Sequence, residues 1–311
     1  YSGRILYAAA GSLVFGLIVL ALYGSEESIS ESRVALSSFE CFEDQKWIPC
    51  DLPVAPYMLV TSDIHLSSAD GRWPETTGQF ERFLEIVSKT PPELIFIVGD
   101  IVDNSIDNYP GSVANWKSEW KTYESIKKTY YDIEFRQSYG TGHDWLNDEM
   151  LDTLDQEIGS RHGVLSWRDM NFVWLSFGPG AYFPNSDDHD SDLEEEDILW
   201  LESVLSDVDQ VSLMFHVPLL TKRSQELGTF SNGRLIVLDP RDPLYRVVDT
   251  YREKIDYIFN GHIHKAFQHS FRGIEMFSCP LKDARSFCTI EEDKDAPKVR
   301  HFRIQADVRL N

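Results

Sequence analysis

Carboxylates and imidazoles recur in short blocks along the sequence, each at the end of an apolar run or in a glycine-rich turn. Oxygen and nitrogen ligands without thiolates suit zinc, iron or manganese. A carboxylate that bridges two such ions makes a centre that activates water and stabilises in-line displacement at phosphorus. Each block alone is a weak signal, but together and in this order they predict a two-metal centre. The blocks are Asp63-x-His65, Gly99-Asp100, Gly142-His143-Asp144, His216 and Gly261-His262-x-His264.

Apolar runs upstream of the blocks predict the strands that position them. The run that starts at Leu59 indicates a buried strand. Positions two apart in extended backbone point the same way, so Asp63 and His65 are expected on one face. Residues 80–87 have apolar side chains at helical spacing, and residues 94–98 are apolar throughout, as in a strand covered on both faces. This strand–helix–strand unit brings two strand ends close together.

The rest of the chain continues the alternation of helices and strands. Residues 115–130 predict an amphipathic helix whose aromatic stripe is interpreted as core rather than as a cofactor contact. Strands are predicted at 211–215 and 255–259, which lead into His216 and His262. The remaining predictions are a hairpin at 164–167 and 171–177, a helix that opens at Asp242-Pro243, and a half-buried antiparallel strand over 301–310.

An acidic segment from Asn185 to Asp197 is interpreted as a solvated loop that leads into a helix. Ser191 and Glu194 have the spacing of a capping box, and acidic side chains in a first turn complement the helix dipole. A calcium site is disfavoured, because the segment lacks the glycine and the final glutamate of an EF-hand loop.

The composition excludes several classes of partner. The 311 residues include 29 Lys plus Arg and 51 Asp plus Glu, for a formal net charge of −22. Such acidity argues against nucleic-acid binding and against docking on anionic lipid through a basic patch. It would also repel an anionic substrate unless metal cations reverse the local field. The hydrophobic content of 42% is that of a globular protein.

The segment from Ile5 to Ser25 carries no charge and is long enough to cross a hydrocarbon core as a helix. We expect a transmembrane anchor in the lipid bilayer, with an uncleaved signal segment or a buried helix as alternatives. Arg4 before the segment and acidic residues after it favour a large domain on the non-cytosolic side. The expected organisation is an anchor at 1–25, a polar linker or arm at 26–56 and one domain at 57–311.

The four cysteines form two local pairs of equal spacing, Cys41 with Cys50 and Cys279 with Cys288. Two small-loop disulfides in an oxidising compartment would explain them, and four ordinary buried thiols are the alternative. The secretory lumen and the mitochondrial intermembrane space both fit an oxidising far side.

In order and spacing, the blocks resemble the calcineurin-like metallophosphoesterase superfamily, and the resemblance extends from about Tyr57 to Leu310. The superfamily pattern is Asp-x-His, Gly-Asp-x-x-Asp, Gly-Asn-His-Asp/Glu, a lone His and Gly-His-x-His. The resemblance implies an α/β fold of four layers, α/β/β/α, two divalent transition metals (Zn, Fe or Mn) and a phosphoester substrate. Residues 111–127 also resemble the membrane-anchored eukaryotic branch typified by transmembrane protein 62.

The resemblance implies a role for each block residue. These roles are the first metal ion for Asp63, His65 and His264, the bridge for Asp100, the second ion for His216 and His262, and protonation of the leaving group for His143 together with Asp144.

The sequence departs from this pattern at one ligand, because Gly142 stands where the superfamily has an asparagine. A glycine has no side chain to coordinate an ion, so a weak or empty second site is the expected consequence, although three protein ligands plus water can still hold a catalytic ion. One hypothesis is a membrane-anchored hydrolase of a phosphomonoester or phosphodiester. The other is a pseudoenzyme that serves as an accessory or structural subunit beside other membrane-protein subunits. A third interpretation, a satisfied polar core, would need several independent burials of polar groups.

Overall fold

The computed structural model describes residues 39–54, 56–67, 73–103, 113–140, 144, 154, 156, 160–177, 193–227, 230–231, 234–235, 237–293 and 297–305. The predicted anchor from Ile5 to Ser25 lies outside these residues. Among the residues described, no helix is long and apolar enough to span a membrane.

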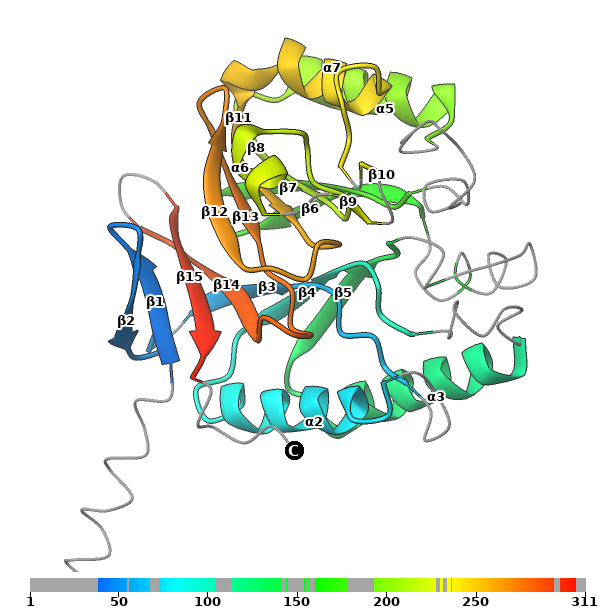
Figure 1. Ribbon diagram of the computed structural model, residues 1–311, viewed down its shortest axis with the longest axis vertical. Coiled ribbons are helices and arrows are strands. Elements are labelled where there is room, and N and C mark those ends of the chain that lie inside the picture. Colours follow the sequence, from blue (N-terminus) through cyan, green and yellow to red (C-terminus); the bar gives the residue numbers. More distant parts are fainter. Residues whose placement is uncertain are drawn as a thin grey trace, which may run out of the picture.

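Two sheets lie face to face, and helices cover the outer face of each (Figure 1). The first sheet contains, in spatial order, β2 (Lys46–Cys50), β1 (Phe39–Glu43), β15 (Lys298–Ile304), β14 (Ser286–Glu291), β3 (Tyr57–Thr61), β4 (Leu94–Val98) and β5 (Glu134–Ser138). The second contains β12 (Phe267–Phe271), β13 (Ile274–Ser278), β11 (Ile255–Asn260), β8 (Val211–Phe215), β7 (Met170–Leu175) and β6 (His162–Trp167). A small ribbon pairs β9 (Phe230–Ser231) with β10 (Arg234–Leu235).

The helices complete the predicted α/β/β/α layer order. The first sheet is covered by α2 (Thr76–Val87) and α3 (Val113–Thr129), and the second by α5 (Glu195–Asp207) and α7 (Pro243–Thr250) (Figure 1). The chain also forms α6 (Lys222–Glu226) and a 3-10 turn at Arg252–Lys254. Asp242 caps α7, accepting hydrogen bonds from the first backbone N–H groups of the helix.

Three hydrophobic clusters fill the three spaces between the layers. The cluster under α2 and α3 includes Trp116 and Tyr123, both fully buried, so the aromatic stripe of α3 is core as predicted. Phe96 and Phe259 lie in the cluster between the two sheets. Leu213 belongs to the cluster under α5 and α7. The central strands β3, β4 and β8 are therefore buried on both faces.

The predicted strand–helix–strand unit is β3, α2 and β4. The two strands are parallel, with Met58 opposite Leu94, and all five residues of each strand are buried. Apolar runs without alternation suit this position because both faces are covered. In the second sheet, β8 and β11 are also parallel neighbours. Parallel pairing brings the carboxyl ends of neighbouring strands to the same sheet edge.

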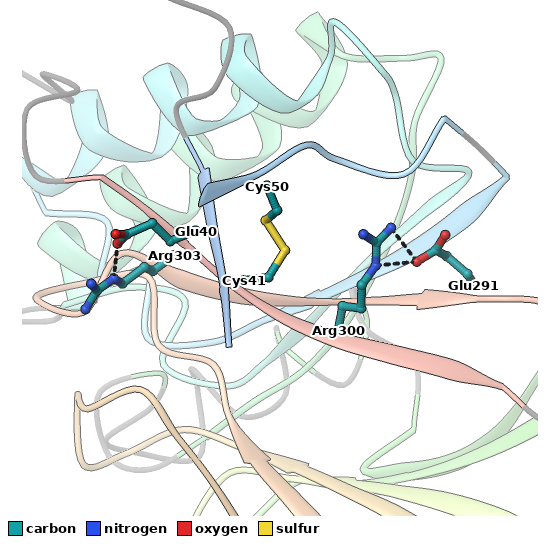
Figure 2. Close-up of a disulfide and its surroundings, with 6 residues drawn as sticks. All are labelled: Glu40, Cys41, Cys50, Glu291, Arg300 and Arg303. Atoms are coloured by element: carbon teal, nitrogen blue, oxygen red, sulfur yellow. Dashed lines mark hydrogen bonds and ion pairs between the residues drawn. A yellow bond between two sulfur atoms is a disulfide. The ribbon is translucent and has the colours of Figure 1, made fainter. Parts of the chain in front are cut away.

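Part of the expected linker is a β-hairpin of the first sheet. β1 and β2 pair antiparallel through a two-residue turn, and β1 pairs with β15. Both turn residues, Asp44 and Gln45, have positive φ (48° and 63°), which matches the twist of a tight hairpin. The Cys41–Cys50 disulfide links the two strands, and Arg303 of β15 pairs with Glu40 of β1 (Figure 2). The hairpin therefore belongs to the folded domain.

Two further sequence expectations are corrected in detail. The N-cap of α5 is Glu194, whose backbone N–H donates to the Asp197 carboxylate, rather than the expected Ser191, which lies outside the described residues. On β15, Phe302 is buried as predicted, but His301 on the opposite face is buried too, because the second sheet covers that face.

The 162–167 and 170–175 strands form the predicted hairpin, and Cys279 is disulfide-bonded to Cys288.

Candidate dimetal centre

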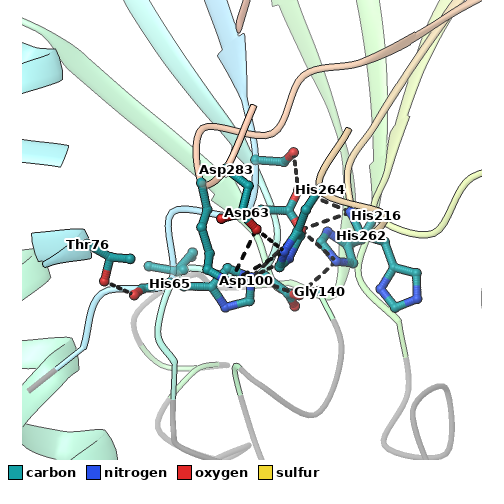
Figure 3. Close-up of polar contacts among 12 residues, drawn as sticks. Asp63, His65, Thr76, Asp100, Gly140, His216, His262, His264 and Asp283 are labelled. Carbon is teal, nitrogen blue, oxygen red and sulfur yellow. Dashed lines mark hydrogen bonds and ion pairs between the residues drawn. The ribbon is translucent and has the colours of Figure 1, made fainter. Parts of the chain in front are cut away.

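Four of the five blocks, which contain the six predicted metal ligands, meet at one edge of the two sheets (Figure 3). They follow the carboxyl ends of four strands, where α/β folds place their binding sites. The strands are β3 for Asp63 and His65, β4 for Asp100, β8 for His216, and β11 for His262 and His264. The structure thus brings together all six metal ligands that the sequence predicts.

Left-handed backbone, rather than extended strand, aims most of these side chains. β3 ends at Thr61, and both Asp63 and His65 have positive φ (51° and 44°). Asp100 (51°), His262 (70°) and His264 (47°) share this conformation. Asp63 and His65 are therefore not in the extended conformation that the sequence predicts, although the ligands do converge. Left-handed residues with a side chain cost about 1–3 kcal/mol each and cluster at functional sites.

Backbone hydrogen bonds hold these loops against one another. The Asp63 N–H donates to the Gly99 carbonyl (3.1 Å) and the His65 N–H to the Asp100 carbonyl (3.0 Å). The His262 N–H donates to both oxygens of Asp63 (2.9 and 3.1 Å). The β3 loop is therefore tied to the β4 loop on one side and to the β11 loop on the other.

Two of the glycines in the blocks allow the loops to come this close. Gly99 has φ 76°, and a Cβ there would lie 2.5 Å from the Cα of Gly140. A Cβ on Gly261 would lie 2.1 Å from an oxygen of Asp63. Both positions exclude any side chain, because backbone and ligand atoms already occupy the space.

The ligand atoms form two groups that share one carboxylate. Asp100 Oδ2 lies 3.0 Å from His216 Nε2 and 3.7 Å from His65 Nε2, so it faces a histidine of each group. Within each group the candidate ligand atoms all lie within 4.8 Å of one another. The groups are Asp63, His65, Asp100 and His264, and Asp100, His216 and His262.

The donor set fits divalent transition metals. His65 Nε2 and His264 Nε2 are 2.9 Å apart, and both approach Asp63 Oδ1, at 3.8 and 3.3 Å. Two imidazole nitrogens and a carboxylate oxygen thus converge on one point. Nitrogen and oxygen donors of this kind suit Zn, Fe or Mn.

Outer contacts decide which ring nitrogen faces the centre. The Nδ1 of His216 lies 2.7 Å from the Val98 carbonyl, and the Nδ1 of His264 lies 3.2 Å from Asp283 Oδ2. In each ring Nδ1–H can donate outward, which leaves Nε2 as the ligand atom. Asp283 was not predicted, because it lies in the loop after β13 and belongs to no ligand block.

The first set of charges in the centre is Asp63, Asp100 and the imidazoles beside them. Burial opposes ionisation of Asp63, but three nearby histidines outweigh it, so the pKa of Asp63 lies well below its ordinary value. These histidines are His216, His264 and His65. Burial likewise opposes protonation of His216, yet the charges of Asp100 and Asp63 raise its pKa to about 10.

The pKa values of His264 and His262 are shifted in opposite directions. Burial opposes protonation of His264, but hydrogen bonds to Asp283 and Asp63 raise its pKa to about 9. Burial and the charge of His216 lower the pKa of His262 to about 3. Before metal binding, each group therefore contains a protonated imidazole, His264 in the first and His216 in the second, while His262 is neutral.

Asp144 has a contact that the sequence does not predict. Its two oxygens accept hydrogen bonds from the backbone N–H groups of Gly140 (2.6 Å), Asp100 (2.9 Å), Ile101 (2.6 Å) and Val102 (3.2 Å). Burial and the charge of Asp100 raise the pKa of Asp144 to about 7. Asp144 thus holds the loop that carries Asp100, the carboxylate shared by the two groups. Its predicted partner His143 and the neighbouring Gly142 lie outside the described residues.

Trp73 and Lys282 border the centre and were also missed in the sequence. The Lys282 Nζ lies 3.0 Å from the centre of the Trp73 ring and 3.5 Å from His264 Nδ1. The Trp73 ring meets His65 edge-on, with ring centroids 4.9 Å apart. The Lys282 side chain is 6% exposed, and the contact of its ammonium group with the ring face is a cation–π interaction. A positive charge therefore lies beside the first group of ligands.

Comparison with known proteins agrees with this architecture. Residues 57–266 match the family model described as calcineurin-like phosphoesterase. The fold is similar to that of a dimetal phosphatase from Danio rerio, with a TM-score of 0.57 and 14% identity over 80% of this chain and 96% of that one. It is also similar to a Staphylococcus aureus protein described as a 5′-nucleotidase, with a TM-score of 0.50 and 12% identity over 81% of this chain and 54% of the other. No curated protein sequence matches the chain.

Proposed function

Because the chain belongs to the calcineurin-like phosphoesterase family, we propose that it hydrolyses a phosphomonoester or phosphodiester in a metal-dependent reaction. The observation that carries the proposal is the Asp100 carboxylate shared between two groups of ligands. A carboxylate placed between two groups of ligands can bind two metal ions at once, and an ordinary buried ion pair has no need of this arrangement.

The chain's residues would divide the work as follows. Asp63, His65 and His264 would hold one ion, His216 and His262 the other, and Asp100 both. When bound, such ions supply a water of lowered pKa and neutralise charge on the phosphoryl oxygens.

Neighbouring groups would fix the ligands in place. Val98 and Asp283 orient the rings of His216 and His264 through Nδ1. Asp144 would keep Asp100 in position through the backbone of its loop. By family resemblance, His143 is the proposed proton donor to the leaving group.

The proposal is tested by turnover of metal-loaded protein on two probe esters, p-nitrophenyl phosphate and bis(p-nitrophenyl) phosphate. Asp100→Asn should lower kcat/KM by about 1,000-fold or more, because both ions lose their bridge. Asp256→Asn is the matched control, since Asp256 is a half-buried carboxylate on β11 outside the ligand groups, and it should leave turnover unchanged. Metal-loaded protein that turns over neither ester would refute an enzymatic function for these substrate classes.

A second candidate function is an inactive accessory subunit, and Gly142 favours it. The family pattern has an asparagine ligand at this position, so the second ion has one protein ligand fewer. An enzyme should contain two transition-metal ions per chain, and an accessory subunit at most one with no turnover. Gly142→Asn should raise activity if the missing ligand is the only defect. Unchanged activity with both ions already bound would argue against that diagnosis.

We also propose that the chain is a single-pass membrane protein with its large domain on the non-cytosolic side. The uncharged run from Ile5 to Ser25 supports an anchor, and two disulfides support an oxidising compartment. The full chain should remain in membranes after alkaline carbonate extraction, while the double variant Val14→Arg, Leu17→Arg should be released. Release of the unaltered chain would contradict the anchor. Kinship with the branch typified by transmembrane protein 62 stays a prediction.

A further inference from the structure

A second cluster of potential metal ligands lies in the core between the two sheets. Cys279 follows β13 in the second sheet, and Cys288 and His301 lie on β14 and β15 of the first. All three are buried, with exposures of 1%, 0% and 1%. Their ligand atoms lie within 4.8 Å of one another. Cys279 and Cys288 form a disulfide, which joins the two sheets.

Hydrogen bonding does not explain why a histidine is buried at position 301. Neither ring nitrogen has a hydrogen-bond partner among the described residues. The residue lies directly opposite Cys288 in the β14–β15 ladder. Its ring packs against Trp47 (centroids 5.1 Å apart) and Phe277 (6.2 Å). Leaving a buried polar group unpaired costs about 1–3 kcal/mol, and a phenylalanine would avoid that cost.

We propose that, when the disulfide is reduced, Cys279, Cys288 and His301 bind a zinc ion. Two thiolates and an imidazole are ligands that zinc prefers. The charges also fit the position, because two thiolates neutralise one divalent cation. A neutral complex can be buried in an apolar core, whereas a monovalent ion would leave a net negative charge there.

The redox step balances as a thiol–disulfide exchange. A dithiol reductant gives two electrons and two protons to the sulfur pair, the S–S bond breaks, and the reductant leaves as its own disulfide. Zinc then replaces the two thiol protons, which pass to solvent, since the thiolate is the ligand form. Reduction therefore exchanges a covalent link between the sheets for a metal link at the same place.

This site is adjacent to the dimetal centre but chemically distinct from it. The Cys279 carbonyl accepts the Ser62 N–H (3.1 Å), next to Asp63, and the Cys279 N–H donates to the Asn260 carbonyl (3.1 Å), next to Gly261. The ligands of the dimetal centre are oxygen and nitrogen only. Thiolate ligation is therefore a signature that separates the two sites in one sample.

The experiment compares oxidised and reduced full-length protein, the latter freed of reductant under argon. Reduced protein should bind one zinc ion per chain more than oxidised protein. With cobalt as the probe, only the reduced protein should show thiolate-to-cobalt charge-transfer absorption. Reduced protein without that absorption, and with unchanged zinc content, would overturn the proposal.

The controls separate the site from general effects of reduction. Cys41→Ser, Cys50→Ser removes the other disulfide, which has the same spacing of nine residues, and should keep both the extra zinc and the cobalt band. His301→Phe should keep the aromatic packing but weaken zinc binding by more than the roughly 10- to 100-fold cost of losing an outer contact. Near-ultraviolet circular dichroism reports whether each sample is folded. Wild-type affinity in folded, reduced His301→Phe would exclude His301 as a ligand.

Discussion

Loading the dimetal centre with zinc at pH 7 should release about two protons per chain. The pKa of His216 is raised to about 10 and that of His264 to about 9. Both rings can donate Nδ1–H outward, to Val98 and Asp283. Their Nε2 atoms face carboxylates of the centre, at 3.0 Å for His216 to Asp100 and 3.3 Å for His264 to Asp63. The Nε2 proton of each ring therefore lies where a metal ion must bind.

The magnitude follows from the distance between each pKa and the working pH. At pH 7 a group with pKa about 9 or 10 is about 99% protonated or more, so each ion must displace one proton. His262, with its pKa lowered to about 3, is already neutral and contributes none. Zinc affinity of each group should accordingly rise about tenfold per pH unit between pH 6 and 8. The dependence should disappear above the raised pKa values, where the protons are already lost.

Isothermal titration in two buffers of equal pH but different ionisation enthalpy counts the protons directly. His216→Asn, which removes one of the two protonated imidazoles, should lower the count by about one. Competition with a chromophoric chelator gives the pH dependence of the affinity. A count near zero at pH 7 would refute the reasoning, because it would mean that the carboxylates do not hold these imidazoles protonated.

Three other residues give independent tests. Asp283→Ala should weaken zinc binding by about 10- to 100-fold, measured by chelator competition, because the ring of His264 loses its outer acceptor. Lys282→Met should raise KM for an anionic ester about tenfold with little change in kcat, since a positive charge beside the centre is lost; steady-state kinetics at low salt would detect it. Burial lowers the pKa of His301 to about 3. Below about pH 6.5 this imidazole is therefore protonated in the unfolded chain but stays neutral in the native state. In urea unfolding of oxidised protein, wild type should lose about 2 kcal/mol more than His301→Phe between pH 7 and pH 5, and equal losses would contradict this.

The order of the ligand blocks and the strands and helices that support them could be predicted from the sequence, because both depend on local patterns of residues. The apolar run that starts at Leu59 and the run at 94–98 lie in buried strands, and the helical spacing of apolar residues predicts α2 and α3. The 39–50 hairpin has no clear sequence signal, because its strands are short, only Phe39 and Cys41 in them are buried, and its partner β15 is distant in sequence. Such pairing has no local signal.

The same limit applies to the groups around the centre. Asp283 and Lys282 reach it through tertiary contact alone, from a loop that contains no ligand. Asp144 was identified as a site residue for its place beside His143, yet its carboxylate binds the backbone of the Asp100 loop. A motif therefore identifies a residue more securely than it identifies the contact that the residue makes.

The geometry of the ligand blocks explains why residues two apart do lie together, as predicted, although their backbone is left-handed rather than extended. Asp63-Ile64-His65 and His262-Ile263-His264 have the same construction, with two left-handed ligands on either side of a buried isoleucine. The isoleucine is fixed in the core, with exposures of 2% and 9% in the two blocks, and so anchors the turn. Glycine would adopt this backbone without strain, but it has no ligand atom. Histidine and aspartate at these positions accept backbone strain that glycine would avoid, and in exchange they provide ligand atoms. This is expected of a site maintained for metal binding rather than for stability.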